Sequence, residues 1–269
     1  MINKKPKIGL ALGSGGVRGL SHIGVIKVLE KNNIPIDFIS GSSIGALIGG
    51  LYAATKDIKQ IEKLALGINW RKMLSLLFDP GLRQGLLKGA RIKSGIEDCI
   101  GRIQFEDLKI PLSVVATDLK NGQVVILRQG SVSLAIRASI SVPLTFQPIQ
   151  YQNKLLADGG LSMPVPVEPL QKMGADFIIA VNVDNKNIIN KKNKNLGLYG
   201  IADTSINIMR YYLSLLEAEK ANIVICPDVY VRGWNYFLHP QEIILAGQKA
   251  TQKVIPQIKE KLGPFNSRF

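Results

Sequence analysis

The chain has 269 residues, of which 46% are hydrophobic, and its formal net charge is +14. This size and apolar content predict one large domain over residues 1–269 with a sizeable core. No uninterrupted run of about 18 apolar residues occurs, and the first apolar stretch is short, which excludes a transmembrane helix and a signal peptide from our expectations. Cys99 and Cys226 are far apart in the sequence and predict reduced thiols in a cytoplasmic protein.

The first expected unit is a buried strand over Ile8–Leu12, followed by a glycine-rich loop and a helix. The loop reads Gly13-Ser-Gly-Gly-Val-Arg-Gly19, and a mostly apolar helical face continues from Leu20 to Leu29. Asn32-Asn33, followed by Pro35, predict the end of this helix.

The next strand and helix meet at Gly41-Ser-Ser-Ile-Gly45, which has the G-x-S-x-G form of a nucleophile elbow. An apolar stretch ending in a strand over Phe38–Ser40 leads in, and a helix over Ile44–Ala54 leads out. Ser43 is therefore expected at a strained turn and at the positive end of a helix. Glycines two positions either side let strand and helix approach closely. A plain glycine- and serine-rich turn is the alternative, and the strand-to-helix context favours the nucleophile.

Neighbouring parallel strands place their following loops at one edge of a sheet, so the Gly13–Gly19 loop is expected beside Ser43. The backbone N–H groups of Gly15 and Gly16, with that of Ile44, are then candidates for an oxyanion hole. A dinucleotide fingerprint would need a glycine where Arg18 stands, and the Gly-Lys-Ser/Thr of a P-loop is absent. Nucleotide binding is therefore disfavoured, while a purely structural glycine turn stays open.

Four later segments are expected to be strands: Leu112–Thr117, Val124–Leu127, Phe177–Val183 and Asn222–Cys226. Their alternation with helices predicts an α/β layered fold whose central, mostly parallel sheet is flanked by helices. A stretch rich in Asn and Lys, about 184–197, predicts a flexible loop. It separates a motif-bearing core, about 7–183, from a helical C-terminal part, about 198–269.

Asp158 is the candidate partner of Ser43. The stretch Tyr151–Ala157 has the pattern of a hairpin-like strand segment, so Asp158 ends a strand and Gly159-Gly160 permits a tight turn. Taken without the other motifs, Asp-Gly-Gly is most often only a turn.

Three motifs occur in this order: Leu12-Gly-Ser-Gly-Gly-Val-Arg-Gly-Leu-Ser-His-Ile-Gly-Val-Ile26, Gly41-Ser-Ser-Ile-Gly45 and Ala157-Asp-Gly-Gly160. Together with Arg137-Ala-Ser-Ile-Ser-Val-Pro143 and Phe146-Gln-Pro148, they resemble the small bacterial patatin-like phospholipases over about residues 7–183. The resemblance implies a patatin-like fold and a Ser–Asp dyad that hydrolyses acyl esters of lipids, with Ser43 as nucleophile and Asp158 as its partner. The motif residues that would support the dyad are Gly13, Arg18, Gly19, Gly41, Gly45, Gly159 and Gly160.

A Ser–Asp dyad raises a chemical difficulty, because an ordinary Asp has a pKa of about 3.9. Asp158 is therefore expected to act by proximity, with much of the rate coming from the oxyanion hole. The order Ser43, Asp158, His239 also matches the triad of an α/β-hydrolase, so an esterase that uses His239 is one alternative. Two features count against this esterase: only one strand precedes the elbow, and His239 precedes a predicted helix over Gln241–Lys261. A noncatalytic lipid- or acyl-binding regulator is the second alternative.

The net charge of +14 is compatible with nucleic acid, an anionic membrane surface or solubility alone. No nucleic-acid motif accompanies the basic residues, so we expect no nucleic-acid partner. The segment Leu64–Ile92 mixes apolar side chains with cations and is the predicted peripheral contact with an anionic membrane, with a core-packed helical hairpin as an equal alternative. Arg18 is expected to brace the glycine-rich loop or to meet an anionic head group. No metal-ligand cluster occurs, so neither a metal nor another cofactor is expected.

Overall fold

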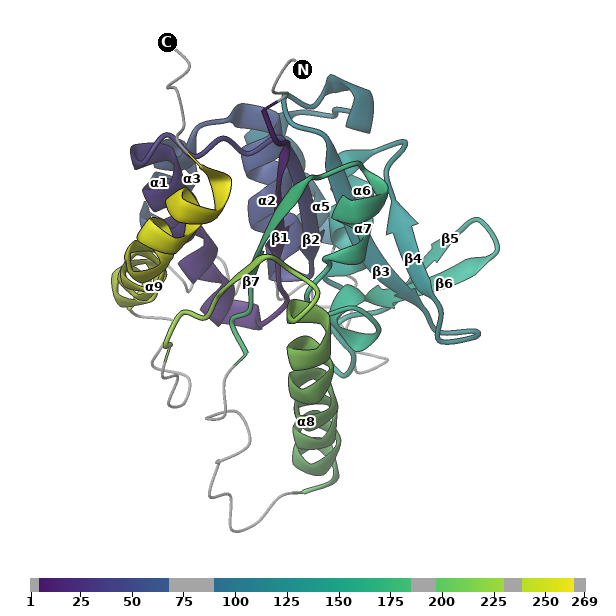
Figure 1. The fold of residues 1–269 in the computed structure, drawn as a ribbon. Coiled ribbons are helices and arrows are strands. Elements are labelled where there is room, and N and C mark those ends of the chain that lie inside the picture. Colours follow the sequence, from purple (N-terminus) through teal and green to yellow (C-terminus); the bar gives the residue numbers. More distant parts are fainter. Residues whose placement is uncertain (1–4, 68–89, 185–196, 230–238, 264–269) are drawn as a thin grey trace.

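The computed structural model describes residues 5–67, 90–184, 197–229 and 239–263. Most of the predicted membrane contact Leu64–Ile92, and most of the predicted loop 184–197, lies outside the described residues. The described chain forms a sheet covered by helices, which confirms the expected α/β layered fold (Figure 1). None of the described helices is long and apolar enough to cross a membrane.

The sheet is parallel at its centre and mixed at one end. Its strand order is β5-β6-β3-β2-β1-β7-β8, with β4 paired to β3. The strands are β1 Ile8–Leu12, β2 Phe38–Ser42, β3 Leu112–Asp118, β4 Val124–Leu127, β5 Ile149–Tyr151, β6 Lys154–Asp158, β7 Phe177–Val181 and β8 Ile223–Ile225. Strands β3, β2, β1, β7 and β8 run parallel to their neighbours in that series, whereas β4 and β6 pair antiparallel with β3 and β5 pairs antiparallel with β6.

The helices pack against both faces of this sheet. The α-helices are α1 Ser21–Lys31, α2 Ile44–Thr55, α3 Ile58–Gly67, α5 Ala90–Ile100, α6 Val132–Ser139, α7 Glu168–Lys172, α8 Leu198–Ala218 and α9 Pro240–Leu262. The described residues also form three short 3₁₀ helices, η1 Gly16–Leu20, η3 Phe105–Asp107 and η4 Gly159–Leu161.

Strand β1 shows how the sequence builds two cores, because all five of its residues are buried. Leu10 and Leu12 belong to the larger apolar cluster, and Ala11 belongs to a smaller one that includes Leu170 of α7 and Ala218 of α8. Side chains alternate along a strand, so a continuous apolar run such as Ile8–Leu12 is what a strand covered on both faces requires.

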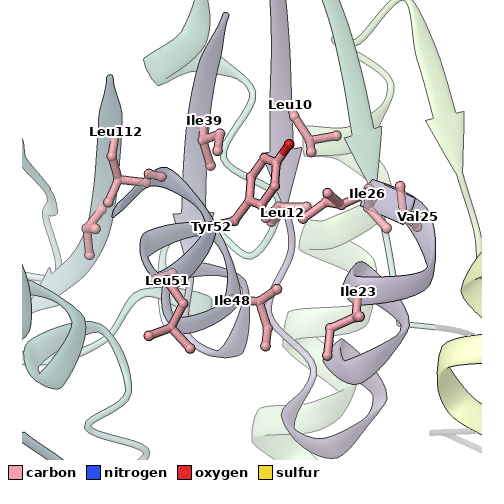
Figure 2. Close-up of a cluster of buried hydrophobic side chains, with 14 of the residues drawn as sticks. Leu10, Leu12, Ile23, Val25, Ile26, Ile39, Ile48, Leu51, Tyr52 and Leu112 are labelled. Carbon is pink, nitrogen blue, oxygen red and sulfur yellow. The ribbon is translucent and has the colours of Figure 1, made fainter. Parts of the chain in front are cut away.

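The larger core lies between the sheet and helices α1 and α2. Figure 2 shows side chains from β1, β2 and β3 directed toward Ile23 and Ile26 of α1 and Ile48 of α2. Helix α9 packs on α1 at very close range, since a Cβ added to Gly24 would lie 2.0 Å from the Ile244 carbonyl oxygen. The N-terminal and C-terminal parts of the chain are thereby joined in one core.

Most expected elements are present with shifted ends. Strand β2 extends to Ser42, two residues beyond the expected end, and the segment Tyr151–Ala157 forms the end of β5, a tight turn and most of β6. The expected flexible loop does not begin at Asp184, because that side chain is fully buried between two arginines. The compositional signal of the Asn- and Lys-rich stretch does not reveal this buried ion pair.

Candidate active site

Ser43 lies on the turn between β2 and α2, with φ 55° and ψ −121°. A positive φ is uncommon for a residue with a side chain, and functional sites are where such backbone strain concentrates. The flanking glycines are required by close packing: a Cβ on Gly41 would lie 2.5 Å from Ala46 Cα, and one on Gly45 would lie 2.0 Å from the Leu12 carbonyl oxygen. The G-x-S-x-G pattern therefore has the geometry of a nucleophile elbow here.

The glycine-rich loop follows β1 at the same sheet edge as the elbow, because β1 and β2 are parallel neighbours. Its start is fixed by hydrogen bonds from Gly13 N to the Val181 carbonyl oxygen and from Ser14 N to the Pro164 carbonyl oxygen, at 3.1 and 2.8 Å. Gly19 packs directly on Ile44, since a Cβ there would lie 2.2 Å from Ile44 Cγ2. The loop and the elbow are therefore in contact.

Three backbone N–H groups of this region have no acceptor among the described residues: those of Gly15, Gly16 and Ile44. Gly16 has φ 57°, and a Cβ on Gly15 would lie 2.2 Å from Val183 Cγ2, so both positions require glycine. Free N–H groups next to a serine hydroxyl at a helix N-terminus are the groups that can stabilise a developing oxyanion.

Asp158 ends β6 and lies directly against Ser43. The Ser43 hydroxyl donates to Asp158 Oδ2 at 2.5 Å, and the Gly160 N–H donates to Asp158 Oδ1 at 2.7 Å. Burial raises the pKa of Asp158 to about 6, while the hydrogen bonds from Ser43 and Gly160 and the charge of Arg210 act in the opposite direction. A carboxylate with this pKa is a better general base near neutral pH than an ordinary Asp, which answers the difficulty raised by the sequence.

The C-terminal end of α6 contacts both members of the pair. Ser139 Oγ accepts a hydrogen bond from Ser43 N at 2.8 Å, and the Ser141 carbonyl oxygen accepts one from Asp158 N at 3.0 Å. Arg137 Nη1 donates to Ser141 Oγ at 2.6 Å, and its guanidinium lies over the Phe146 ring. In the sequence, the stretch Arg137–Pro143 contributes only to the family resemblance, and no pattern predicts these contacts.

Arg18 braces the glycine-rich loop through an ion cluster. Its guanidinium donates to Asp184 Oδ1 at 2.8 Å, and Arg210 of α8 donates to both oxygens of the same carboxylate, at 2.9 and 3.1 Å. Burial lowers the pKa of Arg18 to about 10, and the charge of Arg210 adds to that effect while Asp184 opposes it. Both arginines stay charged at neutral pH, so the cluster carries one net positive charge near Ser43 and Asp158.

Neither histidine touches the Ser43–Asp158 pair. His22 is fully buried, its Nε2 lies 2.8 Å from the Gly13 carbonyl oxygen, and burial lowers its pKa to about 4. The ring is thus neutral and its Nε2–H supports the base of the glycine-rich loop. His239 precedes α9 with its side chain 56% exposed, 3.5 Å from Glu242. The described contacts of Asp158 therefore give no support to a triad through His239.

Among the described residues, no group of three or more His, Cys, Asp or Glu side chains has the arrangement of a metal site. The described site offers a serine hydroxyl, a buried carboxylate, unpaired N–H groups and a nearby cationic cluster.

Comparison with protein families and curated proteins gives consistent matches. Residues 10–170 match the family model described as patatin-like phospholipase. An uncharacterized NTE family protein of Mycobacterium bovis is 40% identical over 183 residues, which cover 68% of this chain and 50% of that protein. Lysophospholipase NTE1 of Debaryomyces hansenii is 38% identical over 188 residues, which cover 68% of this chain and 12% of that protein. The chain thus matches half or less of the length of these curated relatives.

Two solved structures share the fold. VipD from Legionella pneumophila aligns with a TM-score of 0.64 at 16% identity, covering 94% of this chain and 67% of VipD. The type III effector protein ExoU aligns with a TM-score of 0.52 at 14% identity, covering 94% of this chain and 53% of ExoU. At such low identity these similarities concern the fold alone.

Proposed function

Because this chain belongs to the patatin-like phospholipase family, we propose that it hydrolyses acyl esters of lipids, either phospholipids or lysophospholipids, with Ser43 as nucleophile and Asp158 as base. The observation that carries the proposal is the 2.5 Å hydrogen bond from Ser43 Oγ to Asp158 Oδ2 at a turn with φ 55°. A hydroxyl held against a base in this way is an activated nucleophile.

The reaction would run in two steps through a covalent acyl-enzyme. Ser43 Oγ attacks the ester carbonyl carbon while Asp158 Oδ2 accepts the hydroxyl proton, and the proton then passes to the departing alcohol oxygen. Asp158 next takes a proton from water, whose oxygen attacks the acyl-Ser43 carbonyl carbon. Release of the fatty acid returns the proton to Ser43 and restores the starting pair.

The negative charge that develops on the carbonyl oxygen needs donors that are already in place. The N–H groups of Gly15, Gly16 and Ile44 are proposed as this oxyanion hole, supported by their lack of described acceptors and by the contact between Gly19 and Ile44. One such donor contributes about 10²–10³-fold to the rate in a well-studied serine hydrolase. Arg18 acts by holding the loop rather than by meeting the substrate, since its guanidinium already pairs with Asp184.

The cysteines and the proposed lipid substrate together suggest where the enzyme acts. Cys99 and Cys226 are free thiols, in keeping with a cytoplasmic protein. We propose a cytoplasmic enzyme that contacts membranes peripherally, without metal or other cofactor.

The test uses Ser43→Ala with Ser42→Ala as its matched control. Ser42 is buried beside Ser43, and its hydroxyl has no hydrogen-bond partner among the described residues, so removing it should leave the dyad intact. Mass spectrometry of lipids released from a mixed phospholipid and lysophospholipid extract should show fatty acid release by wild type and Ser42→Ala only. A fluorophosphonate probe should label Ser43 in both active proteins. Lipid binding without turnover or labelling would instead favour the noncatalytic regulator.

A further inference from the structure

Exposed apolar side chains are concentrated on α8. Eleven large hydrophobic residues are exposed in the described part of the chain, and seven of them belong to this helix. These seven are Leu198, Tyr199, Ile201, Met209, Tyr212, Leu215 and Leu216. A cluster of exposed apolar side chains is typical of a surface that binds a protein, a ligand or a membrane.

Five of these residues lie on one side of the helix. Leu198, Ile201, Met209, Tyr212 and Leu216 follow one another at spacings of three, four or eight residues, which place side chains on one helical face. Their exposed fractions are 86%, 53%, 64%, 59% and 62%. We call them the α8 stripe. A 21-residue helix is about 32 Å long, so the stripe runs along most of that length.

The α8 stripe carries no charge. The acidic and basic residues of α8 are Asp203, Arg210 and Glu217. Arg210 pairs with Asp184, and Glu217 pairs with Lys220 at 2.8 Å. Asp203 is five residues from Leu198 and two from Ile201, spacings that place it on another side of the helix. Insertion of the stripe into an apolar medium would therefore not require the burial of a free ion.

Helix α8 is also tied to the active site. Arg210 is bound to the carboxylate that holds Arg18 of the glycine-rich loop, and Asn182 Nδ2 donates to Ser214 Oγ at 3.1 Å. The helix contacts η4, which directly follows Asp158. In Figure 1 its C-terminal half adjoins the sheet, and its N-terminal half extends away from the rest of the described chain.

We propose that the α8 stripe docks the protein on a lipid bilayer by inserting into the interface, beside the site that receives the substrate. This inference rests on the proposed function, because a lipid hydrolase must reach acyl chains held in a membrane. An uncharged apolar face with a tyrosine on it has the composition of an interfacial helix. The net charge of +14 attracts the chain to an anionic leaflet and opposes close approach by a second copy. Charge thus favours a bilayer over self-association as the occupant.

The experiment compares two double variants that each replace exposed apolar side chains by glutamine. Met209→Gln with Leu216→Gln alters the α8 stripe, and Leu119→Gln with Leu245→Gln makes the same chemical change elsewhere, at residues 48% and 46% exposed. All proteins carry Ser43→Ala, so that binding is scored without turnover and independently of whether the proposed hydrolysis occurs. Co-flotation with vesicles of equimolar phosphatidylcholine and phosphatidylglycerol measures the partition between water and lipid.

We expect the α8 variant to bind at least about tenfold more weakly than the parent, and the control within about twofold of it. A melting temperature equal to that of the parent protein would show that each variant is folded. Equal vesicle binding by the two folded variants would overturn the proposal. Analytical ultracentrifugation tests the alternative occupant, a second copy of the chain. A parent protein that is a dimer, together with an α8 variant that is a monomer and a control that stays a dimer, would also overturn the proposal, since the stripe would then be an interface between copies.

Discussion

The backbone N–H of Ser43 donates a hydrogen bond to the side-chain hydroxyl of Ser139, 2.8 Å away on the last turn of α6. Ser139 is fully buried, so its hydroxyl has no competition from solvent. Backbone strain of the kind seen at Ser43 costs on the order of 1–3 kcal/mol and persists only where the surroundings enforce it. Ser139 supplies part of that enforcement, and two residues later the Ser141 carbonyl oxygen holds Asp158 N. One short segment thus positions both members of the proposed dyad.

We predict that Ser139→Ala lowers kcat by about ten- to a hundredfold and leaves KM nearly unchanged, because a displaced nucleophile reacts more slowly without binding substrate less well. Steady-state kinetics on a soluble short-chain ester measures both constants. Ser133→Ala is the matched control, since Ser133 is buried on the same helix but bonds Glu97 instead of Ser43. Equal kcat for the two variants would show that Ser139 only stabilises α6.

The sequence predicts Ser43 and Asp158 as a pair because glycines mark the places where strand, helix and loop come close together, and the structure brings the two side chains into contact. The sequence could not identify Ser139, since a hydroxyl that accepts a backbone N–H leaves no pattern in the chain. Asp184 and Arg210 lie 26 residues apart and meet only in the folded protein. Arg18 donates to Asp184 at 2.8 Å, and this contact supports the predicted bracing role rather than contact with a head group.

The sequence predicts a helical part over about 198–269, which includes α8, but it does not predict the exposed apolar face of that helix. Apolar residues at helical spacing ordinarily predict a face packed on the core. On α8 that pattern includes Met209 and Leu216, which are exposed, while Arg210 and Glu217 beside them face polar partners in the protein. Periodicity alone does not distinguish burial in the protein from burial against another surface.

We predict that kcat/KM rises with pH through a midpoint of about 6 and is flat above it. Burial raises the pKa of Asp158 to about 6, and only the ionised carboxylate can accept the Ser43 proton. Below the midpoint the rate should fall about tenfold per pH unit, as the ionised fraction does. A pH–rate profile on a neutral soluble ester checks this, and a midpoint near 4 would mean that Asp158 titrates as an ordinary carboxylate.

We predict that Asp158→Asn lowers activity by about 10²–10⁴-fold, as expected for loss of a general base, without lowering stability near pH 8. The folded-state pKa is above the unfolded value, so the folded protein binds the extra proton between about pH 4 and 6. Stability from Asp158 is therefore present below that window and is lost as pH rises through 6. The neutral amide should remove this dependence, which denaturant unfolding at several pH values measures.

His239→Ala is the comparison for Asp158→Asn. Its exposed ring lies beside Glu242, so we expect activity within about twofold of wild type, since surface side chains of this kind contribute little. A folded His239→Ala protein as inactive as Asp158→Asn would establish a catalytic triad in place of the dyad.

We predict that Arg210→Met moves the midpoint of the pH–rate profile upward. The charge of Arg210 lowers the pKa of Asp158, and its removal also leaves more of the Asp184 charge uncompensated, which acts in the same upward direction. Asp184 keeps Arg18 as a partner at 2.8 Å, so it is not left as an unpaired buried ion.

The control is Arg102→Met, which removes the same charge from a side chain that is 88% exposed and paired at the surface with Glu97. Solvent screens that charge, so this control should keep the wild-type midpoint. Equal midpoints for both variants would mean that the cluster of Arg18, Asp184 and Arg210 holds the loop without tuning the base.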